Sequence, residues 1–484
     1  MPSAHLIVQL FSGSCRSARF LVLVPLAVCL FLLLISENFG EIWSSELVSN
    51  SIPNVFDSKL QVQQVFQIYF ERKGNTLSPI TTMTFVGTND ILLLDKNNGT
   101  VKRIVNGVLL KEPLLDVNVA NKRERGMLGI ESTTYSTNGT KSDPTTHVYL
   151  YYTESKRSDG TDVCQKTYYC KAETYPIGNH LYSYELKDNK LLNPKLLLQL
   201  PAWPAPTHNG GVIRIGPDNN LYLTIGDLVG SANESSRTKA QNYENGKLPD
   251  GRAGILRVTP EGKPVSEVLL GDAFPLNMYY AYGIRNSFGI DFDPITGNLW
   301  DTENGPDYGD EINLVEPGFN SGWSKIQGVW KPMYDIQRGG DLIAGKELLN
   351  PDSSHLVNFD GNGKYSHPEF VWNQTVSPTA IKFLESKNYG IEYENDLFVA
   401  DGNNGYIYHF DLTGDRTALL LNGPLRDRVA NSSQELEDII FAENFGVITD
   451  MDLGPDGYLY ILSHDKNNVG IFRIVPANDN STVT

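Results

Sequence analysis

The part of the sequence most suggestive of chemistry is the run 281–323, AYGIRNSFGIDFDPITGNLWDTENGPDYGDEINLVEPGFNSGW. Five carboxylates crowd around Gly305 and Pro306 in this run: Asp301, Glu303, Asp307, Asp310 and Glu311. Carboxylates with Gly and Pro between them suit a hard divalent cation, which prefers several oxygen ligands, backbone carbonyls included. The spacing is not that of the helix-loop-helix calcium loop. The run therefore predicts either a cation site or a solvated acidic loop.

Other positions carry side chains of catalytic types. His208 precedes Asn-Gly-Gly on a loop leading into an apolar run, and an imidazole there suits either a general base or a structural hydrogen bond. Arg285 and Asn286, in YGIRNSFG, offer a fork of donors and an amide to an anionic or carbonyl-rich ligand, or tie structural elements together. Asp227 is interpreted as a turn cap. Arg125, in KRERGMLGIE, faces either a channel or solvent.

The elements that position these residues are short strands. Apolar runs alternate with Gly, Asn and Asp turns along most of the chain, and a short helix is expected only over 433–441. One phrase recurs: an apolar residue, a Pro- and Asp-containing turn, then an apolar run that ends in a polar residue. Its copies are IGPDNNLYLTIGD, FDPITGNLWDTENG and LGPDGYLYILSHD, with weaker versions in NDILLLDKNNG and ENDLFVADGNNG.

This repetition predicts an all-β protein, a six-bladed β-propeller of four-stranded antiparallel blades. A β-sandwich is the alternative. In a propeller, the loops at one end of the channel converge on its axis, so that residues far apart in sequence can share one pocket.

The composition limits the class of partner. The chain has 484 residues and a formal net charge of -17, which argues against nucleic acid, because phosphate binding needs a basic face. This excess of acidic over basic residues fits a secreted or surface protein that binds small neutral ligands or cations.

The N-terminus is expected to be a targeting segment. Arg16 and Arg19 precede an apolar run over residues 20–35. Sixteen helical residues span about 24 Å, short of the roughly 30 Å hydrocarbon core. We predict a signal peptide or signal-anchor over 1–36, with an uncleaved anchor and an external body favoured. A polar linker over 37–54, one propeller domain over 55–475 and a polar tail over 476–484 follow.

An external location makes a local disulfide plausible between Cys164 and Cys170, with two free thiols as the alternative. The same location suits glycosylation at six sequons: Asn98, Asn138, Asn233, Asn373, Asn431 and Asn480.

Five motifs, in this order, resemble the soluble quinoprotein glucose/sorbosone dehydrogenase family, which includes the aldose sugar dehydrogenases. They are GMLGIE, HNGGVIRIGPDNNLYLTIGD, YGIRNSFGIDFDPITGNLW, ENGPDYGDEINL and PGFNSGW. The resemblance covers roughly residues 55–475. It implies a six-bladed propeller with pyrroloquinoline quinone (PQQ) over a calcium ion in its central mouth, and oxidation of an aldose sugar at C1.

The resemblance also implies roles for individual residues. His208 matches the base that removes the hydroxyl proton, and Arg285-Asn286 matches the pair that contacts the quinone. The carbonyls of Gly305 and Pro306 match ligands of the catalytic calcium. A second, structural calcium is implied at Glu311 and at a main-chain oxygen near Ser321, and Arg125 aligns with a glutamine that lies near the substrate in some members.

Three positions depart from the family pattern. Where the family has a Lys and two Arg facing the quinone carboxylates, this chain has Asn403, Val447 and Thr449. Each charge-assisted hydrogen bond lost is worth about 1.5–3 kcal/mol. Three functions are therefore open: a PQQ- and Ca²⁺-dependent sugar dehydrogenase using an external electron acceptor, a recognition propeller that has lost the quinone, and a calcium-dependent lactone or sugar-ester hydrolase.

Overall fold

The computed structural model describes residues 52–69, 79–135, 144–156, 177–229, 236–335, 341–347, 353–465 and 468–478. The chain divides into two units, Met1–Ser51 and Ile52–Thr484, and every element below belongs to the second. Several sequence predictions fall outside the described residues: the apolar segment 20–35, Cys164, Cys170 and the sequons at Asn138, Asn233 and Asn480. Within the described residues, no helix combines the length and the apolar character needed to cross a membrane.

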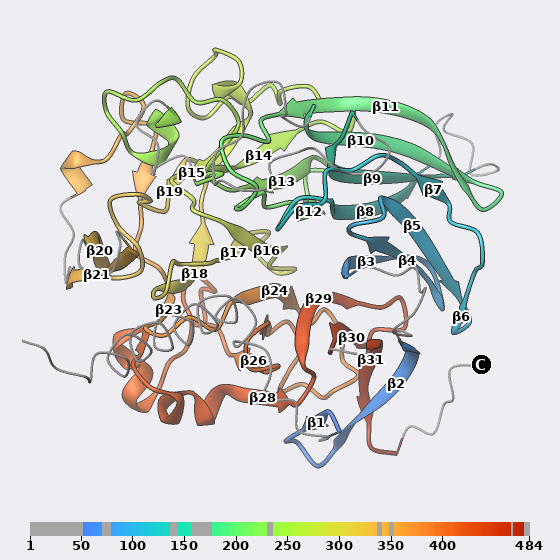
Figure 1. Cartoon of the computed structure of the whole chain (residues 1–484). Helices are drawn as coiled ribbons and strands as arrows, with labels where there is room; N and C mark the ends of the chain where they lie inside the picture. Colours follow the sequence, from blue (N-terminus) through green and yellow to red (C-terminus); the bar gives the residue numbers. More distant parts are fainter. Residues whose placement is uncertain are drawn as a thin grey trace, which may run out of the picture. The chain divides into compact units, whose positions relative to one another are not determined.

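The first three sheets are built mainly of antiparallel strands that follow one another along the chain (Figure 1). The first sheet contains β3 (Ile80–Gly87), β4 (Asp90–Asp95), β5 (Thr100–Val105), β6 (Val108–Leu109) and β7 (Leu115–Asp116). The second contains β8 (Met127–Tyr135), β9 (Thr145–Glu154), β10 (Gly178–Lys187) and β11 (Lys190–Leu200). The third contains β12 (Ile213–Ile215), β13 (Leu221–Ile225), β14 (Gly254–Val258), β15 (Tyr279–Tyr282), β19 (Phe319–Asn320) and β22 (Lys364–Tyr365).

The second half of the chain repeats this arrangement. One sheet contains β16 (Ser287–Phe292), β17 (Leu299–Glu303), β18 (Asp310–Val315), β23 (Phe370–Trp372) and β27 (Val429–Ala430). The next contains β24 (Pro378–Phe383), β25 (Leu397–Asp401), β26 (Ile407–Phe410), β28 (Ile440–Glu443) and β1 (Asn54–Val55). The last contains β29 (Val447–Leu453), β30 (Leu459–His464), β31 (Asn468–Pro476) and β2 (Leu60–Tyr69).

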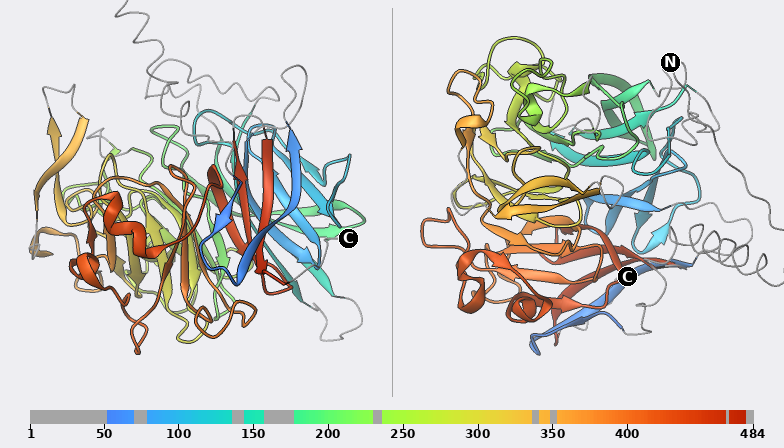
Figure 2. Two further views of the ribbon diagram at one scale, coloured as in Figure 1. Left: turned by 90° about the horizontal axis from the view of Figure 1, so that it is seen from below. Right: turned by 60° about the vertical axis from the view of Figure 1, so that its left-hand side comes forward.

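These sheets surround a common centre, as in a β-propeller (Figure 1). The innermost strands of neighbouring sheets contact one another in a closed circuit, β3 to β8, β12, β16, β24, β29 and back to β3. The hairpin of β20 (Trp330–Asp335) and β21 (Asp341–Glu347) pairs with no other described strand and stands apart at one edge (Figure 2, left). Helical structure in the described residues consists of short 3₁₀ helices, among them Ser433–Ile439, where the sequence predicts a short helix.

The prediction of six four-stranded blades is wrong, because the structure has five blades and one composite sheet. Five blades each draw four strands from one stretch of the chain, and the remaining sheet is a composite in which β2, from the N-terminal side, joins β29–β31. Only two sheets have four strands. The short outer strands β19, β22 and β27 are added in parallel, because long connections return the chain to the same end of the sheets before each one.

The recurring sequence phrase marks the same place in five of these sheets. Its turns join the first strand to the second: β12 to β13, β16 to β17 and β29 to β30, and the weaker copies join β3 to β4 and β24 to β25. Between the sheets, the inward faces form apolar clusters, such as Tyr151 and Leu181 against Leu223 and Leu256. Each large apolar side chain buried in this way contributes about 1.5–3 kcal/mol.

Candidate active site

The predicted catalytic residues lie on loops at one end of two neighbouring sheets. His208 precedes β12, Asp227 follows β13 and Arg285-Asn286 precedes β16. Since the first and second strands of a blade are antiparallel, the start of one and the end of the other lie at the same end. The backbone N–H of Asp227 donates to the carbonyl of Arg285 at 2.9 Å, which fixes these loops to each other.

Gly226 is the point where these loops approach most closely. A Cβ atom there would lie 2.5 Å from the carbonyl oxygen of His208 and 2.6 Å from that of Arg285. Both contacts are with backbone, which cannot rotate away. Only glycine therefore allows the strand end to carry Asp227 beneath His208.

His208 and Asp227 form a hydrogen-bonded pair. Nδ1 of His208 lies 2.6 Å from Oδ1 of Asp227, and the carboxylate is fully buried while the imidazole is 12 % exposed. The backbone N–H of His208 donates to Oε2 of Glu124 at 2.5 Å, in a residue held at φ 60°. No described residue hydrogen-bonds Nε2, so this nitrogen remains available to a ligand.

The surroundings of Asp227 keep it ionised. Burial alone would raise the pKa of this carboxyl, but the charge and hydrogen bond of His208, the indole N–H of Trp323 and the charge of Arg285 hold the pKa at about 2. The Trp323 Nε1 donates to Oδ2 at 2.8 Å. A permanently charged acceptor on Nδ1 keeps the proton of a neutral imidazole on Nδ1 and the lone pair on Nε2. The turn cap expected at Asp227 is thus also the partner of His208.

Arg285 and Asn286 form the adjoining wall. The Arg285 guanidinium donates to the carbonyl of Asn304 at 2.7 Å and lies 5.5 Å from the ring centroid of Trp323. The Asn286 side chain accepts from Gly210 N at 3.3 Å. The pair ties loops together next to His208, as the structural interpretation expects, and the ligand-binding interpretation stays a prediction.

Arg125 takes a different position from the one expected. Its side chain is 1 % exposed, and its guanidinium donates to the carbonyl oxygens of Ala202 and Ala205. It therefore faces neither a channel nor solvent, and it fixes the loop that leads to His208. The residue before it, Glu124, is the one that reaches the site, through the backbone of His208 and Nδ2 of Asn286 at 3.5 Å.

The loop around Gly305 and Pro306 presents unsatisfied oxygen atoms. No described N–H or O–H group donates to either carbonyl, and the buried Oδ1 of Asn304 has no hydrogen-bond partner. Asp310 holds the loop in place, since its Oδ1 accepts from Gly305 N and its Oδ2 from Val376 N, both at 2.8 Å. Free carbonyl and amide oxygens in one loop suit Ca²⁺.

Most of the acidic run is buried. Glu303 and Glu311 stand directly opposite each other on β17 and β18, where like charges repel. The Ser321 hydroxyl donates to Glu303 at 2.6 Å and lies 3.3 Å from Glu311. Neither carboxylate oxygen of Asp301 has a hydrogen-bond partner at ordinary distance. Burial, reinforced by the neighbouring carboxylates, raises the pKa of all three groups well above their ordinary values. Of the five carboxylates in the run, only Asp307 is exposed, as the solvated-loop interpretation expects.

This cluster has the donor set of a calcium site. Besides the three carboxylates, the buried Oδ1 of Asn313 and Oε1 of Gln327 lack hydrogen-bond partners. A divalent cation would relieve the repulsion and satisfy these oxygens together. The family resemblance indicated Glu311 and Ser321 for this site, and the acidic run indicated Asp301 only as one of five clustered carboxylates.

The three positions that depart from the family pattern offer no cation. Asn403 donates to the carbonyl of Thr375 at 3.2 Å, Thr449 donates to that of Ile80 at 3.2 Å, and Val447 is 37 % exposed.

A cation that the sequence analysis missed, Lys96, comes from the corresponding turn of the first sheet. The motif DKNNG in this turn resembles DGNNG in the turn that contains Asn403. This likeness was the signal in the sequence that could have identified Lys96. Burial lowers the pKa of Lys96 to about 8, against the opposing charge of Glu124. Its ammonium group donates to the carbonyl of Arg123. Lys96 thus adds one cation to the surroundings of Glu124 and His208.

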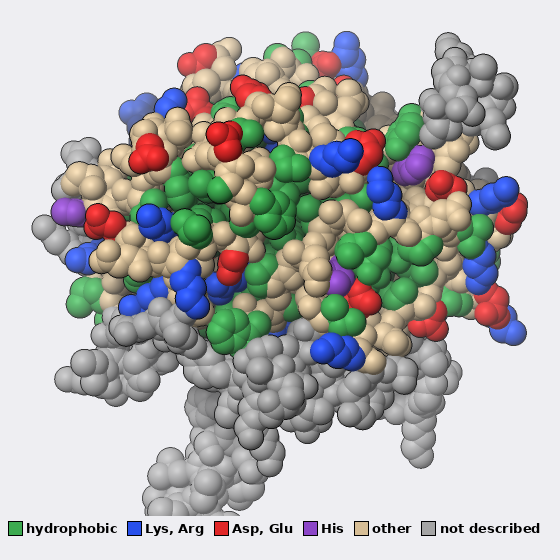
Figure 3. Space-filling model, turned by 90° about the horizontal axis from the view of Figure 1, so that it is seen from above, with side chains coloured by type: hydrophobic (Ala, Val, Ile, Leu, Met, Phe, Trp, Pro, Cys, Tyr) green, Lys and Arg blue, Asp and Glu red, His purple; other side chains and the backbone are tan. Residues whose placement is uncertain are grey.

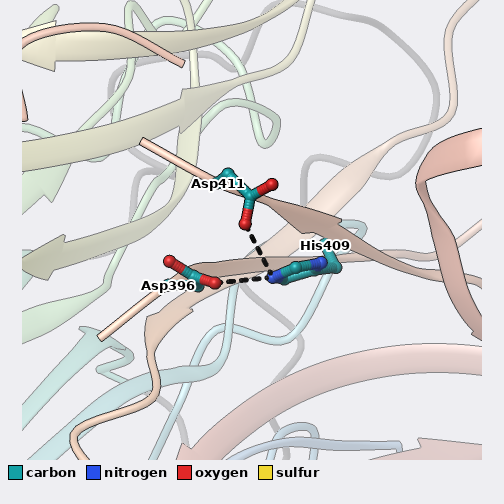
Figure 4. Close-up of side chains that lie close together, drawn as sticks. All are labelled: Asp396, His409 and Asp411. Atoms are coloured by element: carbon teal, nitrogen blue, oxygen red, sulfur yellow. Dashed lines mark hydrogen bonds and ion pairs between the residues drawn. The ribbon is translucent and has the colours of Figure 1, made fainter. Parts of the chain in front are cut away.

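A separate group of possible metal ligands lies in the sheet of β24–β28 (Figure 4). The His409 Nε2 stands 3.0 Å from Asp396 and 3.9 Å from Asp411. None of the predicted site residues belongs to this group. Its hydrogen bond joins His409 on β26 to Asp396, which directly precedes β25.

Residues 78–473 match the Glucose / Sorbosone dehydrogenase family. The chain belongs to this family. It is 25 % identical over 285 residues to the aldose sugar dehydrogenase YliI of Escherichia coli, covering 58 % of this chain and 63 % of YliI. It is 33 % identical over 332 residues to quinoprotein glucose dehydrogenase B of Acinetobacter calcoaceticus, covering 60 % and 65 %. The chain thus spans just under two thirds of the length of these relatives.

Solved structures of the family share the fold. The PQQ-bound aldose sugar dehydrogenase of Streptomyces coelicolor superposes with a TM-score of 0.53 at 19 % identity, covering 87 % of this chain and all of that one. The similarity supports the propeller and a sugar dehydrogenase type of oxidoreductase at the level of the family.

Proposed function

We propose that this member of the glucose/sorbosone dehydrogenase family is a PQQ- and Ca²⁺-dependent dehydrogenase that oxidises an aldose sugar at C1. The observation that carries the proposal is the His208–Asp227 pair, with Nε2 left available beside Arg285 and Asn286. We further propose an extracytoplasmic location, membrane attachment through residues 20–35 alone, and an external electron acceptor.

The residues present fit the implied calcium ions. The carbonyls of Gly305 and Pro306 would hold the catalytic ion, beside the unpartnered Asn304 Oδ1. Glu311, with the Ser321 turn and the orphaned Asp301, would hold a structural ion. These assignments use only oxygen donors, as calcium prefers.

The residues also fit a quinone, although the site offers it fewer cations than the family pattern does. Arg285 and Asn286 would contact it, and Lys96 is the cation available near Glu124. When bound, PQQ supplies the two-electron acceptor for the C1 hydride, and Ca²⁺ supplies a Lewis acid for its carbonyl. Fewer cations predict weaker quinone binding, not a different reaction.

The chain's own residues manage the proton. The Nδ1–H of His208 donates a hydrogen bond to Asp227, so that Nε2 accepts the proton of the sugar C1 hydroxyl as the hydride leaves that carbon. Asp227 stays ionised, because of its pKa of about 2, and stabilises the imidazolium that forms. Trp323 holds the second oxygen of Asp227 and keeps the carboxylate from turning. The product is the sugar lactone.

A titration of the purified protein with PQQ in the presence of Ca²⁺, followed by absorbance and a dye-coupled sugar panel, tests the proposal. We expect quinone binding and sugar-dependent dye reduction, and we expect His208→Gln to bind quinone but to lose ~10²–10⁴-fold in rate. His367→Gln is the control, since it changes an imidazole outside the site.

The absence of quinone binding at micromolar PQQ would overturn the proposal. It would favour the recognition propeller, for which Asn403, Val447 and Thr449 are the supporting observation. Hydrolysis of lactones or sugar esters without any dye would favour the hydrolase.

A further inference from the structure

A basic groove opens beside the candidate active site. It is a hollow of about 1410 Å³. Five cations line it: Arg237, Lys239, Lys247, Lys325 and Lys331. The described acidic residues in its lining are Glu244 and Asp360, so the groove carries an excess of three positive charges in a chain whose formal net charge is -17. Figure 3 shows several Lys and Arg side chains gathered at the lower left of one face.

The groove lies at the same end of the sheets as His208. One wall, residues 237–247, belongs to the connection that follows β13 and begins with Asp227. The other wall begins at Ser324, directly after Trp323, whose indole binds Asp227. Nδ2 of Asn242 donates to the carbonyl of Trp323 at 2.8 Å and joins the two walls. Trp323 is therefore a neighbour of both the groove and the His208–Asp227 pair.

The positive charges of the groove are crowded together. The Lys325 ammonium and the Arg237 guanidinium lie 4.5 and 4.6 Å from the ring centroid of Tyr243. Burial, with repulsion from Arg237 and Lys331, lowers the pKa of Lys325. Lys239 and Lys247 form no ion pair with a described residue, and neither do Lys325 and Lys331. An anionic ligand would relieve this repulsion.

The groove also presents groups that bind sugars. Asn242, Asn245 and Asn358 supply amides for hydroxyl groups, and Tyr243 supplies a ring. Small-molecule sites usually measure about 300–1,000 Å³, so the groove has room for more than a monosaccharide. The acidic remainder of the chain repels a long nucleic acid.

We propose that the groove binds the sulfate or carboxylate groups of an acidic oligosaccharide whose reducing end reaches His208. The inference rests on the proposed sugar oxidation and narrows its substrate class. Arg237, Lys325 and Lys331 hold the anionic groups, while the Asn side chains bind hydroxyl groups. The reducing end of such a chain is itself an aldose.

Calorimetric titration of the full chain with sulfated maltotetraose and with neutral maltotetraose tests binding without PQQ. We expect the sulfated sugar to bind at least tenfold more tightly and its affinity to fall with added salt. The double variant Lys325→Glu, Lys331→Glu should bind the sulfated sugar at least tenfold more weakly. The double variant Lys187→Glu, Lys195→Glu, which reverses exposed lysines on β10 and β11, should keep the affinity.

Equal binding of the two sugars, or unchanged binding by the Lys325→Glu, Lys331→Glu variant, would overturn the proposal. So would inorganic sulfate that binds as tightly as the sulfated sugar, since the site would then recognise only the anion. Binding of the sulfated sugar without oxidation in the presence of PQQ would support the groove and count against the proposed activity. Oxidation of neutral sugars without preferential binding of the sulfated sugar would support the proposed activity and count against the groove.

Discussion

Replacing Asp227 by Asn tests whether the carboxylate supports His208 as its surroundings indicate. Its folded pKa of about 2, against an ordinary 3.8, corresponds to about 2.5 kcal/mol of stability while the group is ionised. Because the folded pKa is the lower one, this contribution is present above the unfolded pKa and is lost as pH falls through the folded pKa. It should be nearly complete at pH 5 and about 1.3 kcal/mol at pH 3.

The assay is denaturant unfolding of both proteins, followed by fluorescence between pH 3 and pH 5. The difference in free energy of unfolding between the natural protein and Asp227→Asn should narrow by about 1 kcal/mol as the pH is lowered. Asp272→Asn, at an exposed position, controls for the loss of one surface carboxylate. A difference that stays constant, or widens towards pH 3, would refute the inference that His208, Trp323 and Arg285 stabilise the ionised form.

Three other changes test the rest of the site. Trp323→Phe removes the hydrogen bond to Oδ2 of buried Asp227 and should destabilise the protein by about 1.5–3 kcal/mol, measured by unfolding; a change below 0.5 kcal/mol would contradict this role. Gly226→Ala forces a Cβ to within 2.5 Å of the His208 carbonyl and should cost more than about 2 kcal/mol as well as activity; normal stability would show that the loops can separate. Asp301→Asn should stabilise the calcium-free protein, because burial raises the pKa of Asp301 and its charged form is unfavourable, and should reduce the rise in melting temperature on adding Ca²⁺; an unchanged calcium response would remove Asp301 from the cation site.

The sequence was a good guide where the pattern is local. The repeated turn with Pro and Asp located the connection between the first two strands of three sheets, because turn chemistry and strand alternation are encoded within a dozen residues. The prediction of six four-stranded blades was wrong because the pairing of outer strands depends on long connections. The composite sheet arises in the same way, since β2 and β31 are about 400 residues apart.

The acidic run shows the same limit at the level of the site. Its composition predicted either a cation site or a solvated loop, and only the strand register decides between them. Glu303 faces Glu311 across β17 and β18, and Asp301 is enclosed without a donor. Burial depends on which sheet covers these strands, and no spacing within the run contains that information.

By itself, the sequence determined the class of fold, the acidic exterior and the residue types at the site, His208 and Arg285 among them. The tertiary structure decided their partners. Asp227 is the partner of His208 as well as a turn cap, and Arg125 is a buried structural donor. The physical reason is that a buried charge is set by the groups that surround it in space, and in a propeller those groups come from loops far apart along the chain.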